Sequence, residues 1–191
     1  LYLCDADGAY RVTFAGGMTH SSNGIHFDGT TGYGDTHLDD NFTAEGNKHL
    51  SVYSRTDYTG TVCSIGTFQA GIASTMFLIK YASNDGYFRL SWGSSPDATI
   101  TNSKGYFLAS RDSSTSCEIY QDGTLKNTRT QGTGTGAIPY YIGANYNAGS
   151  AASFSPREYC FWSVGTGLSS TQCADLSTRV EALQVALGRN N

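Results

Sequence analysis

The chain has 191 residues, a length at which all-β sandwiches fold as single domains. Only 15% of the residues are charged and the formal net charge is −4, without any cluster of lysine or arginine, which argues against a nucleic-acid partner. No apolar run approaches the length of a membrane span. We therefore predict one domain over residues 1–191, located outside the cell or on the surface of a virion or cell.

The first residues predict short strands and a loop. Tyr10, Val12 and Phe14 alternate as in a strand, and residues 1–23 form an N-terminal strand and loop segment. The chain starts abruptly, without a visible signal peptide, so we expect that a leader or another domain has been removed. Asp28-Gly29 is a turn signal, after which Tyr33 opens a return strand; this predicts a hairpin.

Short strands follow at a regular spacing through the middle of the chain. Asp122-Gly123 predicts a two-residue hairpin turn, and Pro139 marks the start of a strand or a strand at a sheet edge. About a dozen strands separated by turn signals are typical of an antiparallel β-sandwich. The predicted strands of this region cover 49–54, 61–68, 75–82, 87–92, 104–111, 117–121, 124–130 and 138–144.

The segment 157–189 predicts a closing strand and one amphipathic helix. Residues 157–164 are aromatic and β-branched, as suits a strand. Ser169 and Gln172 have the spacing of a capping box, and Gly188 ends the helix. Apolar residues at spacings of three and four predict the buried stripe: Cys173, Leu176, Val180, Leu183 and Leu187. A helix with one apolar stripe must lie on something, so we expect it to pack on the outside of a sheet.

Five cysteines are present, and their spacing is not that of a zinc site. Cys63, Cys117 and Cys160 fall inside predicted strands, where a free cysteine serves as a small apolar filler. Cys4 is the best candidate for a disulfide, with Cys173 as its partner.

Several of these segments together resemble one family. The sequence GIHFDGTTGYGDTHLD resembles the opening hairpin of laminin G-like domains, which belong to the concanavalin A-like lectin/glucanase group. SRDSSTSCEIYQDGTLKNT, YYIGANYN and REYCFWSVGTGLSSTQCADL are similar to later strands and the closing helix of that family, and VEALQVALGR resembles a subgroup from phage and environmental bacterial surface proteins. The resemblance implies an all-β, two-sheet antiparallel jelly-roll sandwich with one C-terminal amphipathic helix packed outside. Fold alone does not fix function in this group, which includes lectins, adhesion domains, glycanases and structural modules.

Catalysis is not what the predicted strands indicate. Retaining glycanases need two carboxylates about 5 Å apart, and in this fold they stand at alternating positions of one strand. Glu118 and Glu158 each stand alone in their predicted strands, and neither a nucleophile elbow nor a zinc-binding helix motif occurs. We therefore expect a protein that is not an enzyme.

Strand parity predicts where a ligand binds. Successive loops of an antiparallel sandwich emerge at alternate ends, which places loops 29–33, 55–60, 83–86, 112–116 and 131–137 at one end and 39–48, 69–74, 93–103, 122–123 and 145–156 at the other. The second end carries most of the long loops, where binding residues concentrate. Amides and aromatic rings there suit a sugar, which gives the predicted ligand-binding residues Trp92, Asn102, Asn145, Tyr146 and Asn147. Asp39 and Asp40 could ligate Ca²⁺, although Asp and Asn are also ordinary turn residues.

Two functional hypotheses remain open at this stage. The first is a non-catalytic carbohydrate-binding or adhesion module of a phage, virion or bacterial surface protein, with a glycan or surface polysaccharide as partner. The second is a structural subunit of a virion or extracellular filament that acts through self-association or contacts with other surface proteins. The low charge suits the second hypothesis, because few charges must be desolvated between copies.

Overall fold

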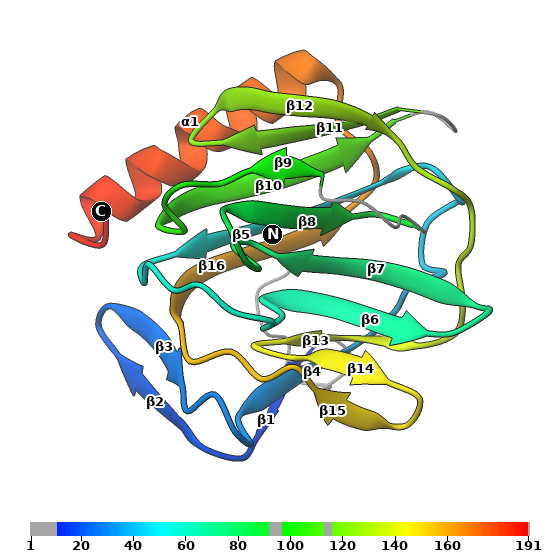
Figure 1. Ribbon diagram of the computed structural model, residues 1–191. Helices are drawn as coiled ribbons and strands as arrows, with labels where there is room; N and C mark the ends of the chain where they lie inside the picture. Colours follow the sequence, from blue (N-terminus) through cyan, green and yellow to red (C-terminus); the bar gives the residue numbers. More distant parts are fainter. Residues whose placement is uncertain (1–10, 92–96, 113–115, 191) are drawn as a thin grey trace.

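A computed structural model describes residues 11–91, 97–112 and 116–190. It confirms the predicted class: two antiparallel sheets face each other, and one helix near the C-terminus lies on the outside (Figure 1). Cys4 and Trp92 lie outside the described residues. Within the described residues, α1 (Ser170–Ala186) lacks the length and apolar composition of a membrane-spanning helix.

One sheet, here called sheet A, has the strand order β1-β4-β13-β6-β7-β8-β9, and the β14–β15 hairpin joins it at β6. The ladder between β14 and β6 is parallel, unlike its other ladders. Pro139 begins β13, as predicted for a proline that cannot donate a ladder hydrogen bond. The strands are β1 (Thr13–Ala15), β4 (Tyr33–Asp39), β6 (Ile65–Gln69), β7 (Ala73–Leu78), β8 (Asp85–Arg89), β9 (Ala98–Thr99), β13 (Pro139–Ile142), β14 (Asn145–Asn147) and β15 (Ser150–Ala152).

The other sheet, sheet B, has the order β12-β11-β10-β5-β16-β3-β2 and carries α1 on its outer face. The β11–β12 hairpin turns at Asp122-Gly123, where both residues have positive φ, as the sequence predicts for this two-residue turn. The strands are β2 (Met18–Ser21), β3 (Gly24–Phe27), β5 (Lys48–Ser54), β10 (Gly105–Arg111), β11 (Ser116–Gln121), β12 (Thr124–Thr130) and β16 (Glu158–Gly165).

Two apolar layers stabilise the fold. The larger layer lies between the sheets and includes Phe27, Leu50, Phe77 and Phe107, all fully buried. Because side chains alternate across a strand, the residues between them point the other way. On sheet B these outward residues include Tyr53, Tyr106 and Leu108, which form a second layer under α1 with Cys173 and Val180. The helix therefore closes a core of its own.

The first predicted hairpin is wrong. β3 pairs with β2 and β16 in sheet B, whereas β4 pairs with β1 and β13 in sheet A, so residues 28–32 cross from one sheet to the other. The Asp28 carboxylate organises this crossing by accepting hydrogen bonds from the backbone N–H groups of Thr30, Thr31 and Gly32. These donors hold the pKa of Asp28 far below its ordinary value. The hairpin of this region is instead β2–β3, and β2 lies in a stretch predicted as loop.

The helix begins as predicted but buries a different face. Ser169 and Gln172 form the capping box, and Cys173 and Val180 are buried. Leu183 and Leu187, however, are 43% and 49% exposed, so their predicted burial is wrong. The buried face continues instead through Ser177 and Gln184. Residues at spacings of three and four thus mark two neighbouring stripes of this helix, one through Leu183 and Leu187 and one through Ser177 and Gln184. The small Ser177 lets the helix approach the turn at Gly123.

Cys63, Cys117, Cys160 and Cys173 are free thiols. Cys117 and Cys160 lie in strands, as predicted, whereas Cys63 lies two residues before the start of β6. Burial raises the pKa of the Cys160 and Cys173 thiols to about 11, which keeps them protonated near neutral pH. They therefore act as apolar groups.

A buried ion pair fixes the start of β5. The Lys48 ammonium lies 2.9 Å from an Asp40 carboxylate oxygen, both side chains are fully buried, and Tyr140 donates a hydrogen bond to the same carboxylate. Asp40, which the sequence suggested as a calcium ligand, is thus engaged by a lysine. Asp39 precedes it at the end of β4, opposite Pro139, and is half-buried.

The observed burial of α1 predicts that truncating Val180 reduces the free energy of unfolding more than truncating Leu183 does. Val180→Ala should reduce the free energy of unfolding by about 2 kcal/mol, because it removes buried methyl groups and leaves a cavity. Leu183→Ala should cost less than about 1 kcal/mol, since that side chain is largely in water. Urea titrations of both variants measure the difference. Equal costs, or a larger cost for Leu183, would contradict the observed docking face.

Removal of one charge of the buried ion pair should destabilise the fold more than removal of both charges. Lys48→Met should cost about 3–5 kcal/mol, because it leaves the Asp40 carboxylate buried without its cation. The double variant Lys48→Met with Asp40→Asn should recover much of that loss, because no charge then remains buried. Urea midpoints of the two proteins provide the comparison, and equal instability of both would show that the pair does not behave as a unit.

Candidate functional site

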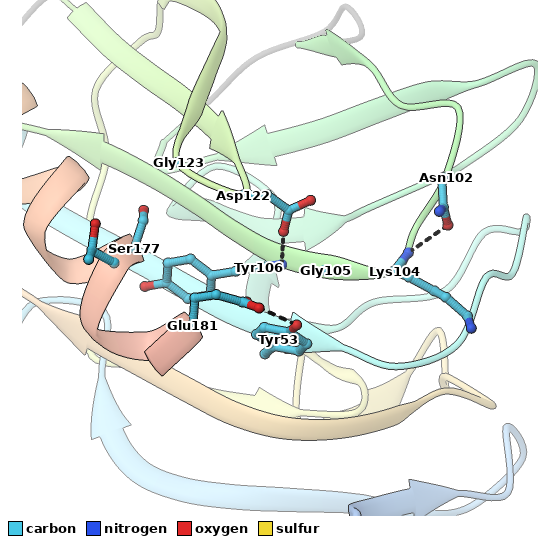
Figure 2. A pocket seen from close by; sticks show the side chains of 10 residues that line it. Tyr53, Asn102, Lys104, Gly105, Tyr106, Asp122, Gly123, Ser177 and Glu181 are labelled. Atoms are coloured by element: carbon cyan, nitrogen blue, oxygen red, sulfur yellow. Dashed lines mark hydrogen bonds between the residues drawn. The ribbon is translucent and has the colours of Figure 1, made fainter. Parts of the chain in front are cut away.

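A cleft of about 590 Å³ lies beside α1 on the outer face of sheet B. Its walls come from the start of β10, the β11–β12 turn and the middle of α1, with β5 beneath, as Figure 2 shows. Ten residues line it: Tyr53, Asn102, Lys104, Gly105, Tyr106, Asp122, Gly123, Ser177, Thr178 and Glu181. The cleft thus joins segments that are far apart in the sequence.

Two tyrosines form the floor. Tyr53 and Tyr106 face each other across the β5–β10 pair, with ring centroids 6.4 Å apart and an interplanar angle of 26°. Each residue is only 1–2% exposed, so a ligand would rest above them and could not stack on an open ring face. The Tyr53 hydroxyl donates a hydrogen bond to Glu181 Oε2 at 3.1 Å, which links the floor to the helix wall.

The hydroxyl of the other floor residue, Tyr106, is buried without a well-aligned hydrogen-bond partner. Burial raises the pKa of this phenol, and the nearby hydroxyls of Ser51 and Ser163 oppose the rise. Tyr106 therefore stays protonated at neutral pH. It contributes shape to the cleft and does not contribute charge.

The β11–β12 turn carries one of two carboxylates in the cleft. Asp122 has a φ of 49°, which an Asx side chain tolerates, and its Oδ1 accepts the Tyr106 backbone N–H at 2.7 Å. Gly105 makes this position possible, because a Cβ there would collide with the carboxylate. The residue is exposed overall, yet its carboxyl group is partly withdrawn from water, and this withdrawal and the charge of Glu181 raise the pKa of Asp122.

The segment before β10 forms the rim. Asn102 Oδ1 accepts the Lys104 backbone N–H at 3.0 Å, and the Asn102 carbonyl accepts a hydrogen bond from Gln121 Nε2 at 3.0 Å. The Asn102 amide N–H₂ therefore remains available as a donor. Lys104 extends away from Asp122 and Glu181 (Figure 2).

The helix wall offers acceptors. Ser177 and Thr178 donate their hydroxyl protons to the carbonyls of Cys173 and Ala174, at 2.8 and 3.0 Å. Each hydroxyl then presents oxygen lone pairs. Together with the two carboxylates they make the cleft rich in acceptors, which is the chemistry that recognises the O–H or N–H groups of a ligand.

The predicted ligand-binding residues do not share one end of the sandwich. Asn102 lies in the cleft, just before Gly105, which pairs with Ser54 at the end of β5. Asp39 and Asp40 lie beside the start of β5, at the opposite end. The parity prediction fails after residue 93, because β9 is a strand of two residues that the sequence did not reveal. One additional reversal moves the loops 112–116, 122–123 and 131–137 to the opposite end, whereas segment 145–156 contains a hairpin of its own, β14–β15.

The predicted residues Asn145, Tyr146 and Asn147 form β14, on sheet A. Asn145 is 5% exposed and its Oδ1 is buried without a hydrogen-bond partner. Tyr146 is half-buried, with its ring edge-to-face against Tyr141 at 5.6 Å. Asn147 is exposed at the end of β14. Among the predicted residues that the structure describes, Asn102 alone therefore belongs to the cleft.

Sequence reasoning missed most of the cleft. Asp122 was recognised only as a turn residue, and Glu181 lies outside the apolar stripe that was predicted for the helix. Glu181 lies beside the buried face of the helix, so a correct prediction of that face could have indicated it. The stripe predicted from the sequence instead included Leu183 and Leu187. Within the described residues, no group of three or more His, Cys, Asp and Glu side chains is arranged to hold a metal ion.

The chain matches no protein-family model and no curated protein sequence. Solved structures do resemble it. One is domain 4 of AbnA, a GH43 extracellular arabinanase from Geobacillus stearothermophilus, in complex with arabinotriose, at 13% identity, a TM-score of 0.50 and 91% coverage of each chain. Another is a mutant of Trypanosoma rangeli sialidase displaying trans-sialidase activity, at 15% identity and a TM-score of 0.60, with 94% of this chain and 30% of that chain covered.

A third similar structure is the binding domain of Paraclostridial Mosquitocidal Protein 1, at 7% identity and a TM-score of 0.51, with 91% of this chain and 48% of that chain covered. This chain therefore spans less than a third of the sialidase and about half of the toxin fragment. At these identities the likeness shows a shared fold: the chain is a β-sandwich of the kind found in the arabinanase domain, the sialidase and the toxin binding domain.

Proposed function

We propose that this chain is a non-catalytic carbohydrate-binding module that acts outside the cell, as part of a phage, virion or bacterial surface protein, and that it binds its glycan in the cleft beside α1. The observation that carries the proposal is the lining of that cleft. Carboxylate and hydroxyl oxygens from a turn and a helix converge there with the Asn102 amide over a floor of tyrosines. Sugars are recognised by such combinations of acceptors and donors, which pair with their many hydroxyl groups.

The comparisons support this choice without fixing the ligand. A domain with the same fold has been solved with arabinotriose bound, and another is a toxin binding domain. In the arabinanase, the similar unit is one domain of a larger extracellular enzyme. A binding module attached to other domains is the role that these similarities favour for this chain.

Hydrolysis is the competing use of two carboxylates in a cleft. The raised pKa of Asp122 would suit a general acid. Two observations favour binding instead: Asp122 is exposed on a turn, and Glu181 is an exposed residue of the helix. A glycosidase places its general acid in an apolar pocket that raises the pKa of the carboxyl group. Recovery of an intact oligosaccharide after prolonged incubation would support the binding role, whereas shortened products would overturn it.

Calcium remains part of the proposal as an option at Asp39, whose carboxylate is half-buried at the end of β4. Asp40 is less suited, because Lys48 already neutralises it. Thermal melts with Ca²⁺ and with a chelator test this option directly. A bound ion raises the melting temperature according to its concentration and affinity, and no shift at millimolar Ca²⁺ would remove calcium from the account.

The proposal predicts that Asn102, and not Tyr146, contributes to glycan binding. On a glycan array, the wild-type chain should retain at least one oligosaccharide, and Asn102→Ala should weaken that binding about tenfold, which corresponds to about 1.4 kcal/mol. Tyr146→Ala, on sheet A, is the matched control and should leave binding unchanged. Loss of binding in the Tyr146 variant alone would place the site on sheet A, and a chain that retains no glycan would refute the proposal.

A structural subunit remains the second candidate, and one observation favours it. Leu183, Val185 and Leu187 expose 43–55% of their surface at the C-terminal end of α1, which would suit contact with a second copy of the chain. Sedimentation over a wide concentration range should then show self-association, and Leu183→Ser with Leu187→Ser should abolish it. A chain that stays monomeric at all concentrations rules this candidate out.

A further inference from the structure

The two carboxylates of the cleft are held by neutral donors. Glu181 accepts from the Tyr53 phenol, and Asp122 accepts from the Tyr106 backbone N–H. Four carboxylates elsewhere in the described residues have a lysine or arginine partner within 4 Å: Asp40 with Lys48, Glu158 with Arg55, Asp57 with Lys80 and Asp97 with Arg129. Asp28 and Glu118, like the cleft carboxylates, are held by neutral donors. The described residues contain no such ion pair for Asp122 or Glu181.

The nearest cations leave the two carboxylates without a contact ion pair. Lys104 lines the cleft but extends away from both carboxylates (Figure 2). Lys126, on β12, attracts Asp122 through space and lowers its pKa, against the opposite effects of burial and of Glu181. Two like charges on opposite walls repel each other, and a cation between them relieves that repulsion.

The hydrogen-bonding capacity of the cleft has the same bias. Ser177 and Thr178 have donated their hydroxyl protons to helix carbonyls, so their oxygens accept. With the carboxylates, four side chains present acceptors. A primary ammonium group is the complementary ligand group, because it carries three donors, one positive charge and no acceptor. A charged donor paired with a carboxylate also makes a stronger hydrogen bond than a neutral hydroxyl does.

Resting on the proposed function, we propose that the ligand of the cleft is a glycan with free amino groups, bound through the ammonium of an unacetylated amino sugar between Asp122 and Glu181. N-acetylation removes the charge and replaces two donors with a bulky acyl group. The cleft should therefore distinguish an amino sugar from its N-acetylated form, which shares the same ring and linkage.

The test is calorimetric titration with two matched oligosaccharides, a β-1,4-linked glucosamine tetramer and its fully N-acetylated counterpart. A pH of about 6 keeps amines of this type largely protonated and carboxyls largely ionised. The glucosamine tetramer should bind at least tenfold more tightly, and raising the salt to about 0.5 M should reduce this preference through screening.

Charge-removing variants identify the residues responsible. Asp122→Asn keeps the acceptor for the Tyr106 N–H and tolerates positive φ, and Glu181→Gln keeps an acceptor for Tyr53, so both proteins should fold. Each should lose most of the preference for the amine. Asp175→Asn removes the same charge from an exposed helix position outside the cleft, and it should keep the preference.

The outcomes separate the two proposals. Equal binding of both tetramers, or a preference that survives in Asp122→Asn and Glu181→Gln, would overturn the amino-sugar inference and leave carbohydrate binding intact. Binding of neither tetramer, with no other glycan retained on the array, would refute the proposed function as well. Binding of a lysine-rich peptide in place of any glycan would show that the cleft takes cationic protein segments, which also overturns the inference.

Discussion

The docking of α1 onto the outer face of sheet B is the contact on which the rest of this structure depends. Sheet B would otherwise present Tyr53, Tyr106 and Leu108 to water, because side chains that alternate with the inner core must point outward. Val180 and Cys173 cover these residues and turn an aromatic sheet face into a second core. The same contact builds the candidate site: the helix supplies one wall of the cleft, and the covered tyrosines become its floor.

The buried core and the candidate site therefore use different faces of one helix. The face through Cys173, Ser177, Val180 and Gln184 is buried, and Thr178 and Glu181 flank it on the cleft side. A binding site assembled at such a boundary has a rigid support, because each side chain in it stands next to one that is packed. The exposed leucines near the end of the helix belong to neither role, which is why a protein contact is the natural second use of this element.

Buried carboxylates and the carboxylates at the cleft also have different partners. Where a carboxylate is fully buried, as at Asp40, a lysine and a tyrosine both bind one of its oxygens, since an unpaired buried charge would be costly. Where carboxylates border the cleft, water and neutral donors suffice, and the charge remains available to a ligand. This contrast gives the cleft an electrostatic character that the net charge of −4 of the whole chain does not reveal.

The sequence by itself determined the class of fold and many of its local features. Alternating residues indicated the strands, Asp122-Gly123 indicated its hairpin turn, and Ser169 with Gln172 indicated the start of the helix, because each of these signals arises within a few neighbouring residues. Only the tertiary structure decided what those elements contact. The two-residue strand β9 exists through its pairing with β8, so no local pattern indicates it, yet its reversal moves the next three loops to the other end of the sandwich. Likewise, two stripes of α1 had suitable spacing, and contact with the sheet selected one of them. Asn102, Asp122 and Glu181 came together through these choices, since a site built from a rim, a turn and a helix depends on long-range packing that sequence spacing does not encode.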